Sequence, residues 1–168
     1  MAEQPRGQLR EYVSDSIDGP YFRLAKGITS LAGNMNPQTK TNTYIDDFSS
    51  TVTTGFQPTW PVDGNIYTGD KANELLYKKA WEMAKGDAAQ VYYIRAKRWE
   101  PGDGLGSYAA KRFLCNFAPA SDGGGAGGED NTFSGELQGR GEPTFGEVVI
   151  TRDPITGVET CVFTANDQ

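Results

Sequence analysis

The sequence contains no histidine and only two cysteines, Cys115 and Cys161. Without histidine the chain has no Ser-His-Asp triad of the usual form, no Cys-His pair and no zinc or iron site with imidazole ligands. Two cysteines are too few for a four-thiolate zinc site. Because each lies at an inward position of an expected strand, we expect two reduced, small, buried side chains. These absences predict no cofactor and no metal site.

The chain also lacks a long apolar run and an excess of basic residues. No stretch approaches the roughly 20 apolar residues that a membrane helix needs, and residues 1–18 lack the apolar core of a secretory signal. We therefore expect the protein to be synthesised in the cytoplasm and not to associate with a membrane. The formal net charge of −6 argues against tight adhesion to phosphate backbones. It does not exclude a role in which DNA passes close by.

Glycine, proline and aromatic residues are abundant instead. A length of 168 residues with 21 glycines and 9 prolines predicts one domain, residues 1–168, with many turns and long glycine-rich loops. The 8 Phe, 8 Tyr and 3 Trp residues are sufficient to anchor one hydrophobic core. We expect an ordered chain rather than a disordered one.

The clearest helix signal lies at residues 70–86. Apolar residues recur there at the i, i+3, i+4 and i+7 spacing that puts them on one face of a helix. Asp70 is placed to cap the first turn, and Gly86 to end the helix in the left-handed conformation. We expect packing on a sheet through Leu75, Leu76, Ala80 and Met83.

The composition of most of the remaining sequence predicts β-strands, so we expect a mainly β fold with one helix. The most regular unit is a hairpin at residues 91–117, whose second strand alternates Phe113, Cys115 and Phe117 on one side. A C-terminal hairpin is expected at residues 147–164, around a turn at 153–157.

The other expected elements are shorter. Residues 1–20 predict an N-terminal arm with a short strand at 9–13. Pro58, Pro61 and Gly64 are expected to interrupt strand pairing before the helix. Further strands are expected at 21–25, 28–31, 43–48, 51–56 and 132–139, and loops at 33–43 and 121–131.

Two motifs resemble catalytic or cofactor sites only superficially. Gly123, Gly125 and Gly128 have the spacing of a dinucleotide fingerprint, but no helix is expected to follow and two acidic residues would repel a pyrophosphate. We interpret them as a flexible loop. Asp46 and Asp47 are adjacent on an expected strand, so they face opposite sides and do not form an acid/base pair.

A third feature is a group of five positive charges on the 91–117 hairpin. A nucleic-acid patch is one interpretation. In an acidic protein, pairing with carboxylates of a neighbouring subunit is the interpretation we favour. The five residues, which we take as candidates for a subunit interface or a lumen surface, are Arg95, Lys97, Arg98, Lys111 and Arg112.

The order of several short segments resembles one family of virion proteins, over residues 20–165. The segments are Ile28-Thr29-Ser30-Leu31, Asn36-Pro37, Thr43-Tyr44-Ile45-Asp46-Asp47, Gly55-Phe56-Gln57-Pro58 and Tyr67-Thr68-Gly69-Asp70 before the helix, then Val91-Tyr92-Tyr93-Ile94 and a strand pair between 139 and 163. Together they resemble the major tail tube protein of long-tailed bacteriophages, the siphophages. That family is structural and supplies no catalytic residue.

The resemblance implies an antiparallel β-sandwich or barrel flanked by one helix, in copies that form hexameric rings stacked into a tube for DNA ejection. It implies a place in the virion tail, assembled in the host cytoplasm with tape measure, tail initiator and tail terminator proteins. By analogy, the 91–117 hairpin is a candidate lumen element. Residues 33–43, the N-terminal arm and the residues after Thr164 are candidates for contacts between rings.

Two other classes of function are compatible with the composition. A virion decoration or adhesin-like binding module also has a β-rich fold with exposed loops, and differs in needing a preformed lattice. A carboxylate-based glycosidase requires only Asp and Glu, but the chain is small for one and no aromatic-lined pocket is evident from the sequence.

Overall fold

The computed structural model describes residues 2–45 and 48–167. Within this part of the chain the elements are one α-helix, eleven β-strands and two short 3-10 helices. The strands are β1 (Leu9–Ser14), β2 (Tyr21–Arg23), β3 (Ile28–Leu31), β4 (Pro37–Asn42), β5 (Ser50–Phe56), β6 (Thr59–Asn65), β7 (Gln90–Pro101), β8 (Ser107–Ser121), β9 (Thr132–Gly139), β10 (Thr144–Arg152) and β11 (Glu159–Ala165), and the helices are η1 (Arg6–Gln8), α1 (Lys71–Trp81) and η2 (Gly86–Ala89).

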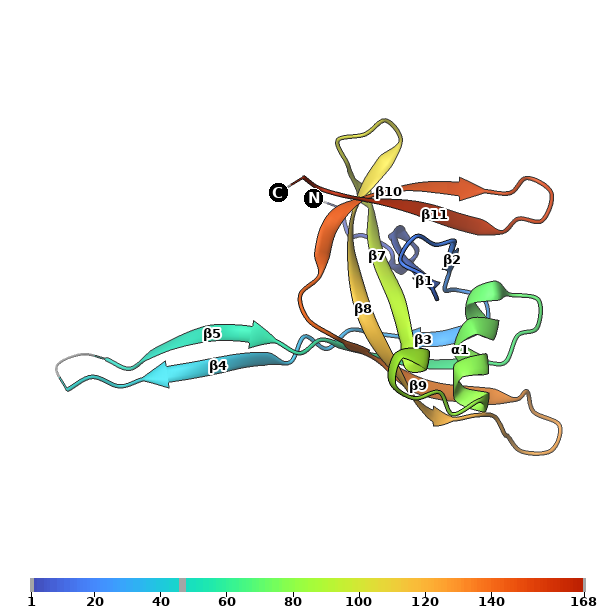
Figure 1. Ribbon diagram of the computed structural model, residues 1–168, viewed down its shortest axis with the longest axis horizontal. Helices are drawn as coiled ribbons and strands as arrows, with labels where there is room; N and C mark the ends of the chain where they lie inside the picture. Colours follow the sequence, from blue (N-terminus) through green and yellow to red (C-terminus); the bar gives the residue numbers. More distant parts are fainter. Residues whose placement is uncertain (1, 46–47, 168) are drawn as a thin grey trace.

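Six of the strands close into an antiparallel barrel. They follow the order β1, β7, β8, β10, β11 and β2, and β2 pairs again with β1. Figure 1 shows β10 and β11 crossing the upper ends of β7 and β8. The interior is filled with side chains, as expected for a barrel of this size. They are Tyr12, Tyr21, Ile94, Ala96, Ala110, Val148 and Cys161.

A second core lies on the other face of β7 and β8. The lower half of β8 also pairs with β9, and the sheet continues through β6 to its terminal strand, β3. Trp60 of β6 packs against Tyr93 and Phe113, with ring centroids 4.9 and 4.6 Å away. Because side chains alternate along β7 and β8, each strand contributes to both cores. The mainly β, antiparallel barrel or sandwich architecture with one flanking helix is thus confirmed.

The helix α1 covers the second core. Asp70 caps it, as expected, by accepting a hydrogen bond from the backbone N–H of Asn73 at 2.9 Å. Leu76 and Ala80 are buried in the core, whereas Leu75 is only partly buried against it. The buried stripe is therefore narrower than the predicted one.

The end of the helix differs from the prediction. The helix ends at Trp81 instead of Gly86, and Met83 is 74% exposed, so Met83 does not pack against the sheet. Met83 adopts a left-handed conformation (φ 49°) and donates its N–H to the carbonyl of Ala80, while Ala84 donates to Lys79. This is a Schellman motif with methionine where glycine is usual, which explains why the sequence pointed to the next glycine instead.

Two other expectations were wrong. Residues 37–42, expected in a loop, form strand β4, and residues 43–45 lie beyond its end. Pro61 and Gly64 do not interrupt pairing, because β6 runs through both of them beside β9. Pro61 has no partner on β3, whose register begins at Val62, so the missing proline N–H disrupts no ladder on that side.

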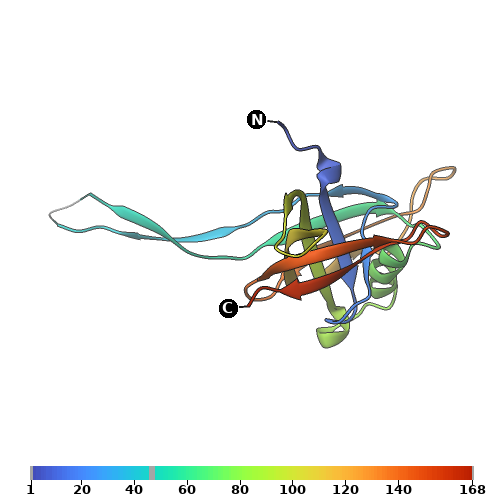
Figure 2. The same ribbon diagram turned by 90° about the horizontal axis from the view of Figure 1, so that it is seen from above.

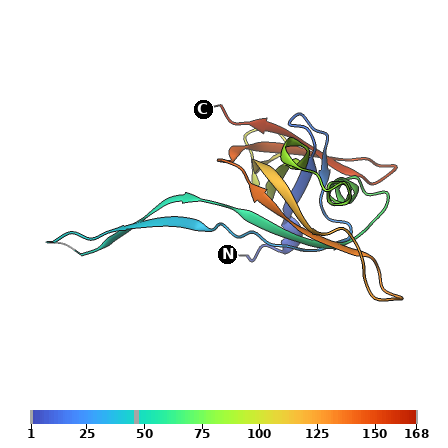
Figure 3. The same cartoon turned by 60° about the horizontal axis from the view of Figure 1, so that its bottom comes forward.

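The hairpin of β4 and β5 leaves the body of the molecule entirely. Figures 1, 2 and 3 all show it projecting far beyond the barrel, with its root beside β3 and β6. The strand expected within the N-terminal arm at residues 9–13 is β1, which lies inside the barrel sheet between β2 and β7. The C-terminal hairpin is confirmed, and Asp153 organises its turn by accepting from the N–H groups of Ile155 and Thr156.

Candidate functional site

The projecting hairpin contributes nothing to either core. In the part of the chain that the structure describes, its two strands pair only with each other, and none of the strand residues is buried. Thr41 and Thr51 are hydrogen-bonded across the strands at 2.9 Å. Asn36 fastens the root by donating to the carbonyl of Gln57 at 3.0 Å. Because isolated two-stranded hairpins are marginally stable in water, this element is suited to contact another molecule.

The tip of the hairpin is apolar as well as exposed. Tyr44, Ile45 and Phe48 are 59%, 102% and 93% exposed. Asp46 and Asp47, which were expected to face opposite sides of a strand, lie between them in sequence and outside the described residues. Large exposed apolar side chains gathered at one point mark an interaction surface.

A hollow of about 1160 Å³ lies at the root of the same hairpin. We call it the root hollow. Two exposed aromatic rings, Phe56 of β5 and Phe145 of β10, line it. Its other apolar walls include Met35, Pro58, Phe113 and Pro143, and its charged lining residues are Lys111 and Glu142.

The structure divides the five predicted basic residues between two faces. Arg98 and Arg112 share a face with the barrel interior, and lie over the rings of Tyr108 (5.9 Å) and Phe163 (4.6 Å). Arg95, Lys97 and Lys111 lie on the opposite face and line a second hollow of about 400 Å³ with Trp99 and Phe145, which we call the basic hollow. The two hollows meet at Lys111 and Phe145. The group expected from the sequence is therefore not one patch.

One row across the sheet organises the basic hollow. Glu11, Arg95, Lys111 and Phe145 are neighbours in register on β1, β7, β8 and β10. Lys111 has no carboxylate within ion-pair distance in the described part of the chain. Partial burial and the nearby charges of Arg95 and Lys97 lower its pKa. An acidic partner would relieve this repulsion.

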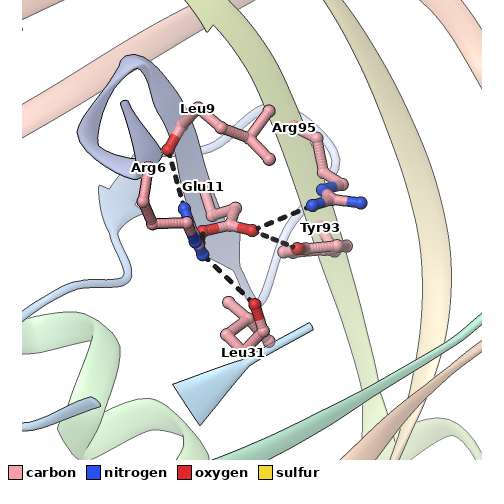
Figure 4. Close-up of polar contacts among 6 residues, drawn as sticks. All are labelled: Arg6, Leu9, Glu11, Leu31, Tyr93 and Arg95. Atoms are coloured by element: carbon pink, nitrogen blue, oxygen red, sulfur yellow. Dashed lines mark hydrogen bonds and ion pairs between the residues drawn. The ribbon is translucent and has the colours of Figure 1, made fainter. Parts of the chain in front are cut away.

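Glu11 is a buried carboxylate that the sequence analysis did not identify. It is 3% exposed and accepts from Arg6 at 2.6 Å, Tyr93 at 3.2 Å and Arg95 at 3.4 Å (Figure 4). Arg6 also donates to the carbonyl of Leu31 at 3.2 Å, so the ion pair fastens the N-terminal segment to β1 and this hydrogen bond fastens it to β3. Burial, and then the Glu11 charge, raise the pKa of Tyr93 well above its usual value.

A second acidic residue, Glu159, was also not singled out. It accepts from the hydroxyl of Tyr12 at 2.6 Å and lies 3.6 Å from both Arg10 and Arg23. These residues come from β1, β2 and β11, which are distant in sequence. No local motif marks such a cluster, because only closure of the barrel brings its members together.

The remaining chemistry-bearing residues have structural roles. Cys115 and Cys161 are free and buried, as expected, and burial raises the pKa of the Cys115 thiol to about 12. The glycine-rich segment joins β8 to β9 with no helix after it. Among the residues with described positions, no group of three or more His, Cys, Asp or Glu is placed to hold a metal ion. In the same residues, no helix is both long and apolar enough to span a membrane.

Comparisons with known proteins give a match at the level of fold. No protein-family model and no curated protein matches the chain by sequence. Among solved structures, one similar chain belongs to the "Virion of native gene transfer agent (GTA) particle", with a TM-score of 0.55 and 9% sequence identity. The similarity covers 85% of this chain and 98% of that chain. At this identity it shows a shared fold.

Proposed function

We propose that this chain is a structural virion protein, the subunit of a phage-type tail tube. Copies form hexameric rings, and the rings stack into a hollow conduit through which DNA leaves the particle. The observation that carries the proposal is the match of this fold to 98% of a chain from a gene transfer agent virion. The siphophage-like order of sequence segments favours the tail tube among virion components. We assign the chain no catalytic activity.

A tube of stacked rings needs two kinds of contact between copies. Within a ring the contact is head-to-tail and closes by rotation. Within residues 2–45 and 48–167, the terminal strand β3 pairs on one side only, with β6, so its other side is suited to pair with a sheet of the neighbouring copy. Between rings we assign the contact to the β4–β5 hairpin, with the N-terminal residues 2–8 and the residues after Thr164 as further candidates.

The net charge of −6 suits passage of DNA without adhesion, because a negative lumen repels phosphates. The 91–117 hairpin remains a candidate lumen element over a restricted length. Its first strand contributes Val91 and Tyr93 to one core and Ile94 to the other, so any lumen contact by this hairpin is confined to its outer part, residues 95–112, which holds the five basic candidates. In a virion tail, tape measure, initiator and terminator proteins would be the other partners.

Negative-stain electron microscopy of the purified protein over a range of concentrations tests the proposal. Hollow tubes or six-membered rings are the expected result. Particles that stay monomeric at every concentration, yet bind a preformed capsid or tail, would contradict it. That outcome would favour the decoration or adhesin-like module, for which the exposed hairpin would be the binding element.

A further inference from the structure

The root hollow and the basic hollow together form a composite groove with two chemistries. One part of the groove is apolar and is lined by Phe56, Pro143 and Phe145. The adjoining part is positively charged and is lined by Arg95 and Lys111. The occupant of the groove should therefore carry large apolar side chains beside carboxylates. We propose that the composite groove binds the hairpin tip of a second copy of this chain, residues 44–48. The inference rests on the proposed function and adds the binding site of the inter-ring contact.

The tip has both required chemistries within five residues of sequence. Tyr44, Ile45 and Phe48 are large, apolar and exposed, and Asp46 and Asp47 supply two negative charges.

The β7–β8 turn (Asp103, Leu105) and the β10–β11 turn (Asp153, Ile155) also combine a carboxylate with an exposed apolar side chain, but neither has three large exposed apolar side chains as the tip does. Two further projecting segments lack large apolar side chains. The acidic loop at residues 122–131 carries no large apolar side chain, and the N-terminal residues 2–8 carry no aliphatic side chain larger than alanine outside proline.

The tip and the groove of one chain cannot meet. The tip lies at the far end of the hairpin, as Figures 1 and 3 show, while residues of the hairpin root line the groove. The six residues of β4 alone separate the two by about 20 Å at roughly 3.4 Å per residue. A contact between tip and groove therefore joins different copies, and each copy offers both halves. Such a heterologous contact repeats along one direction, as stacking requires.

Lys111 is the residue that selects the acidic tip. It lies between Arg95 and Phe145 in the register of the sheet, at the junction of the two hollows. In the single chain Glu11 partly neutralises Arg95 at 3.4 Å and Glu100 pairs with Lys97 at 2.9 Å. Lys111 alone has no such partner among the described residues. An aspartate from the tip would supply it, while the rings of Phe56 and Phe145 cover Ile45 or Tyr44.

Disulfide cross-linking of the full chain tests the contact directly. The variant combining Ile45→Cys with Phe145→Cys places one thiol on the tip and one in the groove, and the native cysteines are buried. Under oxidising conditions we expect a ladder of covalent multimers on a non-reducing gel. The matched control combines Ile45→Cys with Ile155→Cys. Ile155 is an exposed side chain (93%) that lies on the β10–β11 turn, outside the groove. This control should give no ladder.

The outcomes separate this inference from the proposed function. A ladder without tubes supports the tip–groove contact and counts against the tube. Tubes without a ladder would overturn the proposed tip–groove contact but would still support the proposal that the protein forms a tail tube. If the variant gives no more multimers than the control, the tip–groove contact is overturned whether or not tubes form. Cross-linking that stops at the dimer overturns it as well.

Charge exchange tests the role of Lys111. Lys111→Glu, and separately the pair Asp46→Lys with Asp47→Lys, should each raise the concentration needed for multimer formation about tenfold or more. The three changes in one chain should restore most of the loss. Lys85→Glu, an exposed position away from the groove, is the control and should have little effect. Failure of the exchange to restore assembly, or binding of duplex DNA that depends on Lys111, would overturn the assignment.

Discussion

Two hairpins of this protein have the same secondary structure and opposite places in the fold. The β7–β8 hairpin is the centre of the molecule, because each strand has one face in the barrel and the other in the second core. The β4–β5 hairpin has neither face in a core and no other strand beside it. The first stabilises the subunit, whereas the second leaves its surface available to other molecules.

The difference follows from side-chain chemistry rather than from backbone geometry. Beside their basic residues, β7 and β8 carry aromatic or aliphatic residues on both faces, as at Tyr93 and Ile94, which is typical of strands covered on both sides. Along β4 and β5 most residues are Thr, Ser, Gln or Asn, with Val52 and Phe56 as the large apolar exceptions. Threonine favours an extended backbone without requiring burial. A strand can therefore form where no core exists.

The largest expected difference in stability comes from making the same substitution, Phe to Ala, in each of the two hairpins. Phe117 of β8 is 1% exposed, so we expect Phe117→Ala to lower the free energy of unfolding by about 3–5 kcal/mol, through lost burial and a cavity. Phe56 of β5 is 62% exposed, and Phe56→Ala should change it by less than about 0.5 kcal/mol. Urea denaturation of unassembled protein measures both, and equal losses would contradict the comparison.

Next in size is the buried carboxylate beside the central hairpin. Glu11→Gln leaves Arg95 and Arg6 without their shared partner, and we expect a loss of about 1–3 kcal/mol. Glu100→Gln is the matched control, because the Lys97–Glu100 pair is exposed and should contribute less than about 0.5 kcal/mol. Limited proteolysis should also cut the N-terminal segment faster in Glu11→Gln. A neutral effect in both measurements would show that this ion pair does not fasten the segment.

The smallest expected effect on stability comes from removing the projecting hairpin. Replacing residues 39–54 by Asn-Gly joins Gln38 to Gly55, which are already partners in register, through a two-residue turn. We expect the free energy of unfolding to change by less than about 1 kcal/mol, because no buried contact is lost and a loop is shortened. Tube formation should be abolished. A strongly destabilised variant would place the hairpin within the cooperative fold.

The sequence was informative where a pattern repeats locally. It located the central hairpin, the alternation of Phe113, Cys115 and Phe117, and the capped start of the helix. It failed at β4, where polar residues suggested a loop, and at β6, where Pro61 suggested a break. It also failed at Met83, since a helix can end on a residue other than glycine when the Schellman hydrogen bonds form.

By itself, the sequence determined the mainly β composition, the single helix and the absence of histidine chemistry, because each depends on residue type or short-range spacing. Only the tertiary structure decided which cations share a surface. Alternation along β7 and β8 sends Arg98 and Arg112 to one face, and Arg95, Lys97 and Lys111 to the other. Closure of the barrel then brings Glu11 to Arg95 and Glu159 to Tyr12, and it sets Phe145 beside Lys111 at the root of the hairpin. These neighbours are distant in sequence, so long-range strand pairing alone places them together.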